Sequence, residues 1–442
     1  MFAGVHKIFE IFALTRLRAF ARDESGASVV IIGLTLPAII GAMALAAELS
    51  YWQQHHRALQ NAADAAAIAA ATNNGSSYDR EAKAVAALYG FQDGTGNVHV
   101  TVASPASAPG CSANCYTVTV ADAVPLYLSS IVGYQGNTTI GNQRATTLTA
   151  SSVATVQQAY SYCVLALASS GSQGITSNGA PKADLQGCNT MSNTSATCHG
   201  HNLNANVGDA HGTDDGCGVQ QNSNAPTVTD PYAGVASNIP ADSCDGNYPQ
   251  EPAKKKDPAL PAENQWSGSV NLGVGTVVVC GDQQLVDNAV LNNTVVVIEN
   301  GQLDTNGYTL QGSGLTVVFS GSNNASYQHI PTGGGTFDIS APTSGAWSGV
   351  AIYQDPNLTT NVDISAAGNS PTWDITGLVY LPHSSVTFSG AVNKSSHGSN
   401  CFVMVVDNIT INGTGSIFAG DNNCAAAGLT APRGGSRGTL VN

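Results

Sequence analysis

A long uncharged apolar segment near the N-terminus constrains this chain more than any other feature. Residues 27–47 read ASVVIIGLTLPAIIGAMALAA, and no charged side chain occurs among these 21 residues. At about 1.5 Å per residue, a helix of this length covers the roughly 30 Å hydrocarbon core of a bilayer. Pro37 weakens a helix in water but is tolerated in spanning helices. Taken as residues 27–49, the segment predicts a single transmembrane helix.

The charges on either side of this segment predict its orientation. Four basic residues precede it: Lys7, Arg16, Arg18 and Arg22. After it, Arg57 is the only basic residue before Arg80. The positive-inside rule therefore places residues 1–26 in the cytoplasm and the bulk of the chain in the periplasm or outside the cell, anchored in the inner membrane. A buried core helix is one alternative, and a signal peptide cleaved near Ala44–Ala46 is the other.

Composition and cysteine usage agree with export. The net charge is −14, with 15 Lys and Arg against 29 Asp and Glu. Nucleic-acid binding without sequence preference needs clustered cations, so no nucleic-acid partner is expected. All ten cysteines follow the membrane segment, which is typical of disulfides in an oxidising compartment. Spacing leaves their pairing open, except that Cys111 and Cys115 lie between two alternating apolar runs and predict a bridge across a hairpin tip.

Residues 50–264 divide into two predicted regions. In residues 50–156, the helix continues from about Ala27 to Ala71, a short helix follows, and a period-two pattern predicts a small antiparallel sheet. This is a pilin-like α+β layout. Residues 157–264 are rich in Asn, Gly, Ser, Asp and Cys, with weak periodicity. They predict a loop region that ends in an exposed Pro-rich linker around Lys254–Lys256.

The remaining residues, 265–442, predict a mainly β domain. Short runs rich in Val, Ile and Thr alternate with Asn-Gly, Asn-Asn and Gly-Ser turns, and no long helical pattern interrupts them. The runs recur at very roughly 20 residues, which favours a right-handed β-helix or a related solenoid of stacked coils. A β-sandwich would give a similar number of strands and stays open as the alternative.

One polar cluster contains the densest group of possible metal ligands. It lies between Cys198 and Cys217 and comprises His199, His201, His211, Asp214 and Asp215. Zinc sites use Cys and His at short regular spacings, and the spacing here is irregular, so we expect the two cysteines to pair around a polar loop. Motifs for nucleophilic serines, zinc proteases, phosphate loops and calcium loops are absent from the sequence. No metal, cofactor or enzymatic activity is therefore predicted.

The N-terminal fifth resembles a known family. The residues that carry the resemblance are RDESGA at 22–27, the apolar segment with Pro37, AEL at 47–49 and LQNAADAAA at 59–67. Together they are similar to the TadE/TadG-like proteins, which are tight-adherence (Flp pilus) assembly proteins of bacteria. The resemblance covers about residues 20–75. Residues 335–356 and 375–390 are similar, less specifically, to the extracytoplasmic region of long family members.

This resemblance implies an envelope-anchored accessory protein of Flp pilus biogenesis, surface adherence and biofilm formation. The implied partners are the inner-membrane bilayer and the components of the Flp pilus and Tad secretion machinery. Two alternatives are a surface adhesin that binds glycans or surfaces through its β-rich domain, and a β-helix enzyme that acts on polysaccharides.

Two departures from related patterns narrow this expectation. Some TadG proteins carry a von Willebrand A-type domain with a metal-dependent adhesion motif. Here Asp338–Ser340 and Asp363–Ser365 lack the second serine of that motif. Type IV prepilins have Glu at the fifth position after the cleaved Gly, whereas Ile31 stands there relative to Gly26. Processing by a prepilin peptidase is therefore not expected.

Overall fold

The chain forms two compact units. The computed structural model describes residues 24–441, with gaps at 109–110, 158, 172, 180–181, 186, 254–257, 366–371, 390–400, 414–415, 419–423 and 436. Unit 1 comprises Met1–Gln158 and Ser436–Asn442, and unit 2 comprises Ala159–Gly435. Unit 2 is thus an insertion within unit 1 along the chain. Two sets of residues used in the sequence predictions lie outside the described residues. The first is residues 1–23, with the four basic residues that predict the orientation. The second is Lys254–Lys256, in the Pro-rich part.

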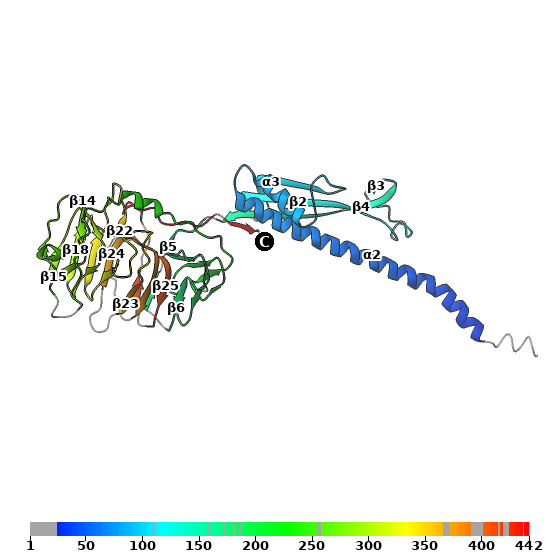
Figure 1. Ribbon diagram of the computed structural model, residues 1–442. Coiled ribbons are helices and arrows are strands. Elements are labelled where there is room, and N and C mark those ends of the chain that lie inside the picture. The colour runs from blue at the N-terminus through cyan, green and yellow to red at the C-terminus, as the bar shows by residue number, and fades with distance from the viewer. Residues whose placement is uncertain are drawn as a thin grey trace, which may run out of the picture. The chain divides into compact units, whose positions relative to one another are not determined.

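The long N-terminal helix that the sequence predicts is confirmed. Helix α2 runs over Glu24–Asn73, a length of 50 residues, with Pro37 inside it (Figure 1). Asn74 follows with φ +41°, a left-handed conformation that ends the helix. Helix α3, Tyr78–Leu88, comes next. Asp79 and Glu81 lie in its first turn, where the positive end of the helix dipole stabilises negative charge.

Unit 1 places the second half of α2 on an antiparallel sheet. Its strands are β1 (His99–Ala108), β2 (Cys111–Pro125), β3 (Thr138–Ile140), β4 (Gln143–Gln157) and β27 (Arg437–Leu440). They pair in the order β1-β2-β4-β27, with β3 beside β4. The face of α2 that meets the sheet is fully buried and almost entirely alanine: Ala62, Ala63, Ala66, Ala67, Ala70 and Ala71. Because alanine side chains are small, the helix axis lies close to the strands.

Unit 2 is built from short strands, which confirms a mainly β region. They are β5 (Tyr162–Ala166), β6 (Ile175–Ser177), β7 (Lys182–Asp184), β8 (Asn189–Ser192), β9 (Ala196–Cys198), β10 (Val207–Ala210), β11 (Asp214–Asp215), β12 (Gln220–Asn222), β13 (Gln265–Ser269), β14 (Gly275–Cys280), β15 (Gln283–Val290), β16 (Thr294–Glu299), β17 (Leu303–Asp304), β18 (Thr309–Ser313), β19 (Thr316–Ser320), β20 (Pro331–Thr332), β21 (Thr336–Ser340), β22 (Val350–Gln354), β23 (Val362–Ser365), β24 (Thr372–Ser389), β25 (Phe402–Ile411) and β26 (Ser416–Phe418). Every pair of these strands that the structure describes is parallel.

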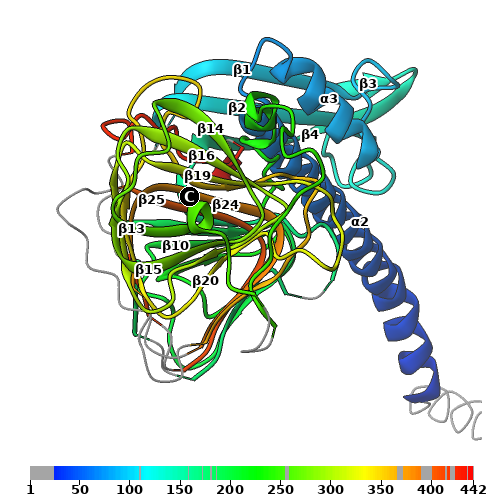
Figure 2. The same cartoon turned by 60° about the vertical axis from the view of Figure 1, so that its left-hand side comes forward.

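The strands of unit 2 are stacked out of chain order. One series of neighbours runs β14-β16-β19-β22-β24-β25-β5-β8-β10-β12. The first strand of the unit, β5, therefore lies within the series, between β25 and β8. Figure 1 shows β5 beside β25, and Figure 2 shows β14, β16 and β19 stacked in this order. The chain therefore builds one end of the stack as far as β12. It then begins again at the other end with β13 and β14 and works back toward β5.

Residues 223–264, which we call the return segment, connect these two ends. Val228 and Tyr232 pack with Tyr353 and Tyr380 in a hydrophobic cluster that is separate from the main core of the unit. The Tyr353 hydroxyl donates a hydrogen bond to the Tyr232 carbonyl at 3.0 Å, and the Tyr380 hydroxyl donates to Asp230 Oδ2 at 2.7 Å. The return segment is therefore fixed on the stack by side chains from several strands.

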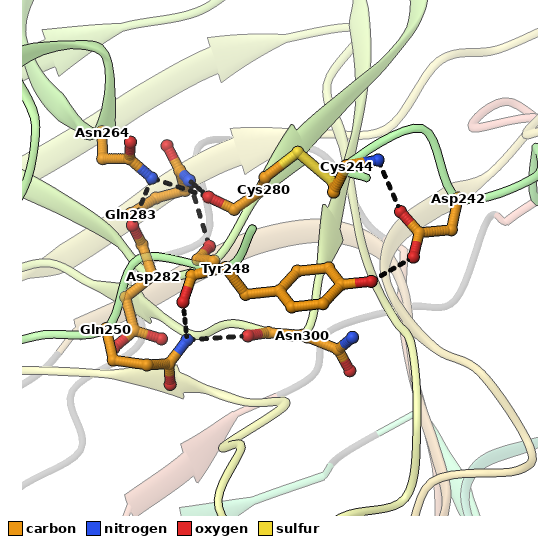
Figure 3. Close-up of a disulfide and its surroundings, with 10 residues drawn as sticks. Asp242, Cys244, Tyr248, Gln250, Asn264, Cys280, Asp282, Gln283 and Asn300 are labelled. Atoms are coloured by element: carbon orange, nitrogen blue, oxygen red, sulfur yellow. Dashed lines mark hydrogen bonds between the residues drawn. A yellow bond between two sulfur atoms is a disulfide. The ribbon is translucent and has the colours of Figure 1, made fainter. Parts of the chain in front are cut away.

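A disulfide holds the middle of the return segment, and hydrogen bonds from Asn264 hold its end (Figure 3). Cys244 pairs with Cys280 of β14, and the Asn264 amide donates to the carbonyls of Cys280 and Asp282, each at 2.8 Å. Gly281 has φ +69°, and a Cβ there would lie 2.1 Å from the Pro249 carbonyl oxygen. Because the two backbones come this close, the position requires glycine.

The structure differs from the expectation of a loop region over residues 157–264. Residues 162–222 hold strands β5–β12. The strands were missed because they are only two to five residues long. Strands of parallel sheets covered on both faces also show no period-two alternation of apolar and polar residues. The Pro-rich part agrees with the predicted exposed segment, because among its described residues, 248–253 and 258–264, only Leu260 and Asn264 are buried.

All ten cysteines are paired, as expected for an exported chain. The disulfides are Cys111–Cys115, Cys163–Cys188, Cys198–Cys217, Cys244–Cys280 and Cys401–Cys424. The bridge predicted in the β1–β2 hairpin is confirmed, and so is the pairing of the two cysteines that enclose the histidine cluster. The other three bridges join segments that spacing alone did not connect.

Candidate functional site

The first half of α2 is an uncovered apolar surface in unit 1. Its side chains from Ile31 to Met43 are all exposed, including Leu34 at 74% and Met43 at 68%. Among the described residues, α2 is the helix that is long and apolar enough to cross a membrane. Exposing this much apolar surface to water is costly, whereas a hydrocarbon environment removes the cost. The length and composition of this segment are compatible with a single-pass membrane anchor.

Glu48 marks the point where this uncovered segment meets the folded part of unit 1. Its side chain is 7% exposed and accepts four hydrogen bonds from the chain that follows β2. The Tyr127 and Leu128 backbone N–H groups donate to Oε1 and Oε2, each at 2.9 Å. Ser129 donates through its N–H to Oε2 at 2.7 Å and through its hydroxyl to Oε1 at 3.1 Å. A carboxylate with this many donors is an effective clamp between helix and loop.

Aromatic side chains gather next to this clamp. Trp52, one turn beyond Glu48, lies against Tyr134 with ring centroids 5.8 Å apart. Tyr51 and Tyr127 are 48% and 62% exposed. The sequence pattern included Glu48 in the family resemblance without assigning it a role. Its partners lie 79 to 81 residues further along the chain, so no local motif connects them.

The LQNAADAAA block of the sequence lies on the packed half of α2. Leu59 is fully buried in the core of unit 1 together with Ala62, Ala63, Ala66 and Ala67 of the block. The Gln60 amide donates to Asp64 Oδ1 at 2.8 Å and to the Ser151 carbonyl of β4 at 3.3 Å. One turn earlier, His55 Nε2 lies 2.9 Å from Asp122 Oδ2 of β2. The block thus specifies how closely the helix packs on the sheet.

Comparison with known families bears directly on this helix. Residues 26–73 match the family model described as "Putative Flp pilus-assembly TadE/G-like". The match covers α2 almost from end to end and confirms the resemblance seen around residues 20–75. No curated protein and no solved structure matches the chain.

The histidine cluster of the sequence does not come together as a metal site. Among the described residues, no three His, Cys, Asp or Glu side chains form a group that could hold an ion. His201 Nδ1 accepts the Leu203 N–H at 3.0 Å, and His211 Nδ1 lies 2.9 Å from the Ala225 carbonyl oxygen. Burial raises the pKa of Asp214 to about 7, and the charges of neighbouring carboxylates add to the effect. These side chains serve the local packing of the loop.

Two grooves in unit 2 have different chemical character. The larger has a volume of about 800 Å³ and is lined by Ser, Thr, Asn, Gly and Ala with Trp347, without an ionisable side chain. The smaller, about 640 Å³, is lined by Asp242, Glu299 and Asp355 together with Tyr248 and Tyr327. Acid–base catalysis needs titratable groups, so the second groove is the one that could support it.

Glu299 is the distinctive residue of this acidic groove. It is 2% exposed, and burial raises its pKa, with the charges of Asp242 and Asp355 acting in the same direction. The Tyr248 hydroxyl donates to Asp242, and the whole region lies beside the Cys244–Cys280 disulfide (Figure 3). The sequence did not single out these carboxylates, because they come from the return segment and two separate strand regions.

Proposed function

We propose that this protein is a membrane-anchored accessory of Flp pilus assembly that acts in pilus biogenesis and surface adherence through protein–protein contacts. The observation that carries the proposal is the coincidence of the family match with α2. Its first half is apolar and uncovered, and its second half is seated on a sheet. One helix thus joins a membrane anchor directly to a folded body.

We also propose that the anchor is a single pass through the inner membrane, with the N-terminus inside and the rest of unit 1 beyond the anchor, together with unit 2, on the periplasmic or extracellular side. Two features support this orientation. Basic residues lie before the apolar segment. All five disulfides lie after it, in the part that would reach an oxidising compartment.

The membrane helix offers a surface for close helix packing. A Cβ atom added at Gly33 or at Gly41 would have no atom within 4 Å, so both positions are uncovered. In membranes, small residues let two helix backbones approach, because van der Waals contact replaces the missing hydrophobic drive. We propose that Gly33, Ala38, Gly41 and Ala42 pack against helices of the pilus or of its secretion platform.

A deletion strain tests this function. Complementation with the wild-type gene should restore Flp pili and surface attachment, whereas Gly41→Leu should not, because the larger side chain separates the helices while remaining apolar. Leu34→Ile is the matched control on the same helix and should complement fully. Normal pili and attachment in the deletion strain would refute the pilus role. Full complementation by Gly41→Leu would refute the packing surface.

For unit 2 we infer a β-solenoid in place of a sandwich. Sandwiches are built from antiparallel sheets, whereas the described strand pairs of unit 2 are parallel and continue from coil to coil in register. An experimental structure with antiparallel pairing among β14, β16 and β19 would overturn this inference.

We propose that the protein acts by binding and without catalysis, and the acidic groove defines the test of the enzymatic alternative. A shallow groove with a buried carboxyl of raised pKa, two further carboxylates and two tyrosines has the residue types that polysaccharide hydrolysis uses. Turnover of acidic or neutral polysaccharides by the purified protein, lost in Glu299→Gln, would establish that alternative. Binding of unmodified glycans or abiotic surfaces without turnover would favour the adhesin alternative.

A further inference from the structure

The loop clamped by Glu48 is itself an exposed apolar surface. It spans residues 126–135, with the sequence LYLSSIVGYQ, and joins β2 to β3. Ile131 is 78% exposed, Val132 is 65% exposed and Tyr127 is 62% exposed. The sequence carries no charged side chain between Asp122 and Arg144. Several large apolar side chains exposed on one short loop are typical of a contact with a membrane or with another protein.

The clamp determines where this loop lies along the helix axis. Residues 27–47 form the uncharged part of α2 and span about 31 Å at the standard rise, the thickness of the hydrocarbon core. Glu48 directly follows them and binds the backbone of Tyr127, Leu128 and Ser129. The loop is therefore held at the level where the helix leaves the bilayer.

The side chains at this level match those of a membrane interface. Tyr51, Tyr127 and Tyr134 are all partly or largely exposed, and Trp52 lies against Tyr134. Tyrosine concentrates at the boundary between headgroups and acyl chains, because its ring is apolar and its hydroxyl can remain hydrated. The Trp52 Nε1 atom is buried, so Trp52 contributes by supporting Tyr134. A protein partner would leave unexplained why the aromatic residues coincide with the end of the spanning segment.

We propose that the loop 126–135 is a second membrane contact. Ile131 and Val132 enter the acyl boundary of the leaflet next to unit 1, and the tyrosines lie among its headgroups. This contact rests on the proposed membrane anchorage and is independent of the pilus role. Together with α2 it attaches unit 1 to the bilayer at two points, so that the unit cannot rotate freely about the helix axis.

Fluorescence quenching in lipid vesicles tests this contact on the full-length protein. All native cysteines are paired, so a cysteine introduced at Ile131 provides a specific site for an environment-sensitive dye. Leu36→Cys, near the middle of the uncharged segment, reports on anchorage. Ser76→Cys, an exposed position beyond the far end of α2, is the aqueous control. The vesicles contain phosphatidylcholine and phosphatidylglycerol, with nitroxide either near the headgroup or deep in the acyl chain.

The proposal requires a blue-shifted dye at position 131 that loses more fluorescence with the shallow nitroxide than with the deep one. The dye at position 36 should show the reverse order, and the dye at position 76 should lose fluorescence with neither. A dye at 131 that stays solvent-like while the dye at 36 is quenched would overturn the loop contact alone. No quenching at 36 would overturn the anchorage and the loop contact together. A blue shift at 131 that disappears when the protein is diluted in lipid would show a contact between two copies and also overturn the proposal.

Discussion

The clamp between Glu48 and the loop after β2 predicts a large effect of one conservative substitution. In Glu48→Gln one carboxylate oxygen becomes an amide NH₂ group. Each oxygen of Glu48 accepts at least one backbone N–H, Tyr127 at Oε1 and both Leu128 and Ser129 at Oε2. If the new NH₂ group takes the place of Oε1, it faces the Tyr127 N–H. If it takes the place of Oε2, it faces the N–H groups of Leu128 and Ser129.

The magnitude follows from the bonds that are lost. Hydrogen bonds to a charged group contribute about 1.5–3 kcal/mol each, and a buried donor left without an acceptor costs about 1–3 kcal/mol. We expect the free energy of opening the loop to fall by about 3–5 kcal/mol. Since each 1.4 kcal/mol is about tenfold in an equilibrium constant, amide exchange in the loop should accelerate by at least about two orders of magnitude.

Hydrogen exchange followed by mass spectrometry on the full-length protein in detergent measures this directly. The peptide that covers Tyr127–Ser129 should exchange faster in Glu48→Gln, while peptides from β2 and β4 should keep their wild-type rates. Glu81→Gln is the matched control, because that carboxylate is exposed on α3. Wild-type exchange of the loop in Glu48→Gln would refute the argument that the carboxylate holds the loop on the helix.

Three further changes test the packing, the crosslinks and the titration of the two units. Ala66→Leu inserts three extra carbon atoms where α2 meets the sheet and should destabilise unit 1 by about 1–3 kcal/mol in chemical unfolding, while Ala58→Leu on the exposed face should be nearly neutral. Replacing Cys244 and Cys280 by serine opens a crosslink over a sequence separation of 36 residues, and unit 2 should lose about 4 kcal/mol by the chain-entropy relation; an unchanged unfolding midpoint would contradict this. Burial raises the pKa of Glu251 from 4.5 to about 8, with neighbouring carboxylates adding to it, so the folded unit binds a proton that the unfolded chain releases. The contribution of Glu251 to stability should therefore be greatest below about pH 4.5 and should fall as the pH rises toward about 8. We expect a loss of about 1–2 kcal/mol, because solvent screens this half-buried group. Glu251→Gln should remove this pH dependence.

The features that the sequence determined by itself are those that depend on neighbouring residues. The uncharged run of residues 27–47 predicts the apolar half of α2, and the alanine-rich block at 59–67 predicts its packed half, because helix propensity and side-chain size act over a few turns. The Cys111–Cys115 bridge was predictable for the same reason, since its sequence separation is 4 residues. The family resemblance also depends on this local segment.

The tertiary structure decided everything that depends on distant partners. The sequence gives no sign that β5 lies between β25 and β8, because parallel strands pair through backbone groups that every residue carries. The same holds for β27, which returns to pair with β4 of unit 1 after the whole of unit 2. In the sequence, Glu48 is one charged residue at the end of an apolar segment, and nothing near it indicates a partner. Its role as a clamp exists only because folding brings the loop after β2 within hydrogen-bonding distance of its carboxylate.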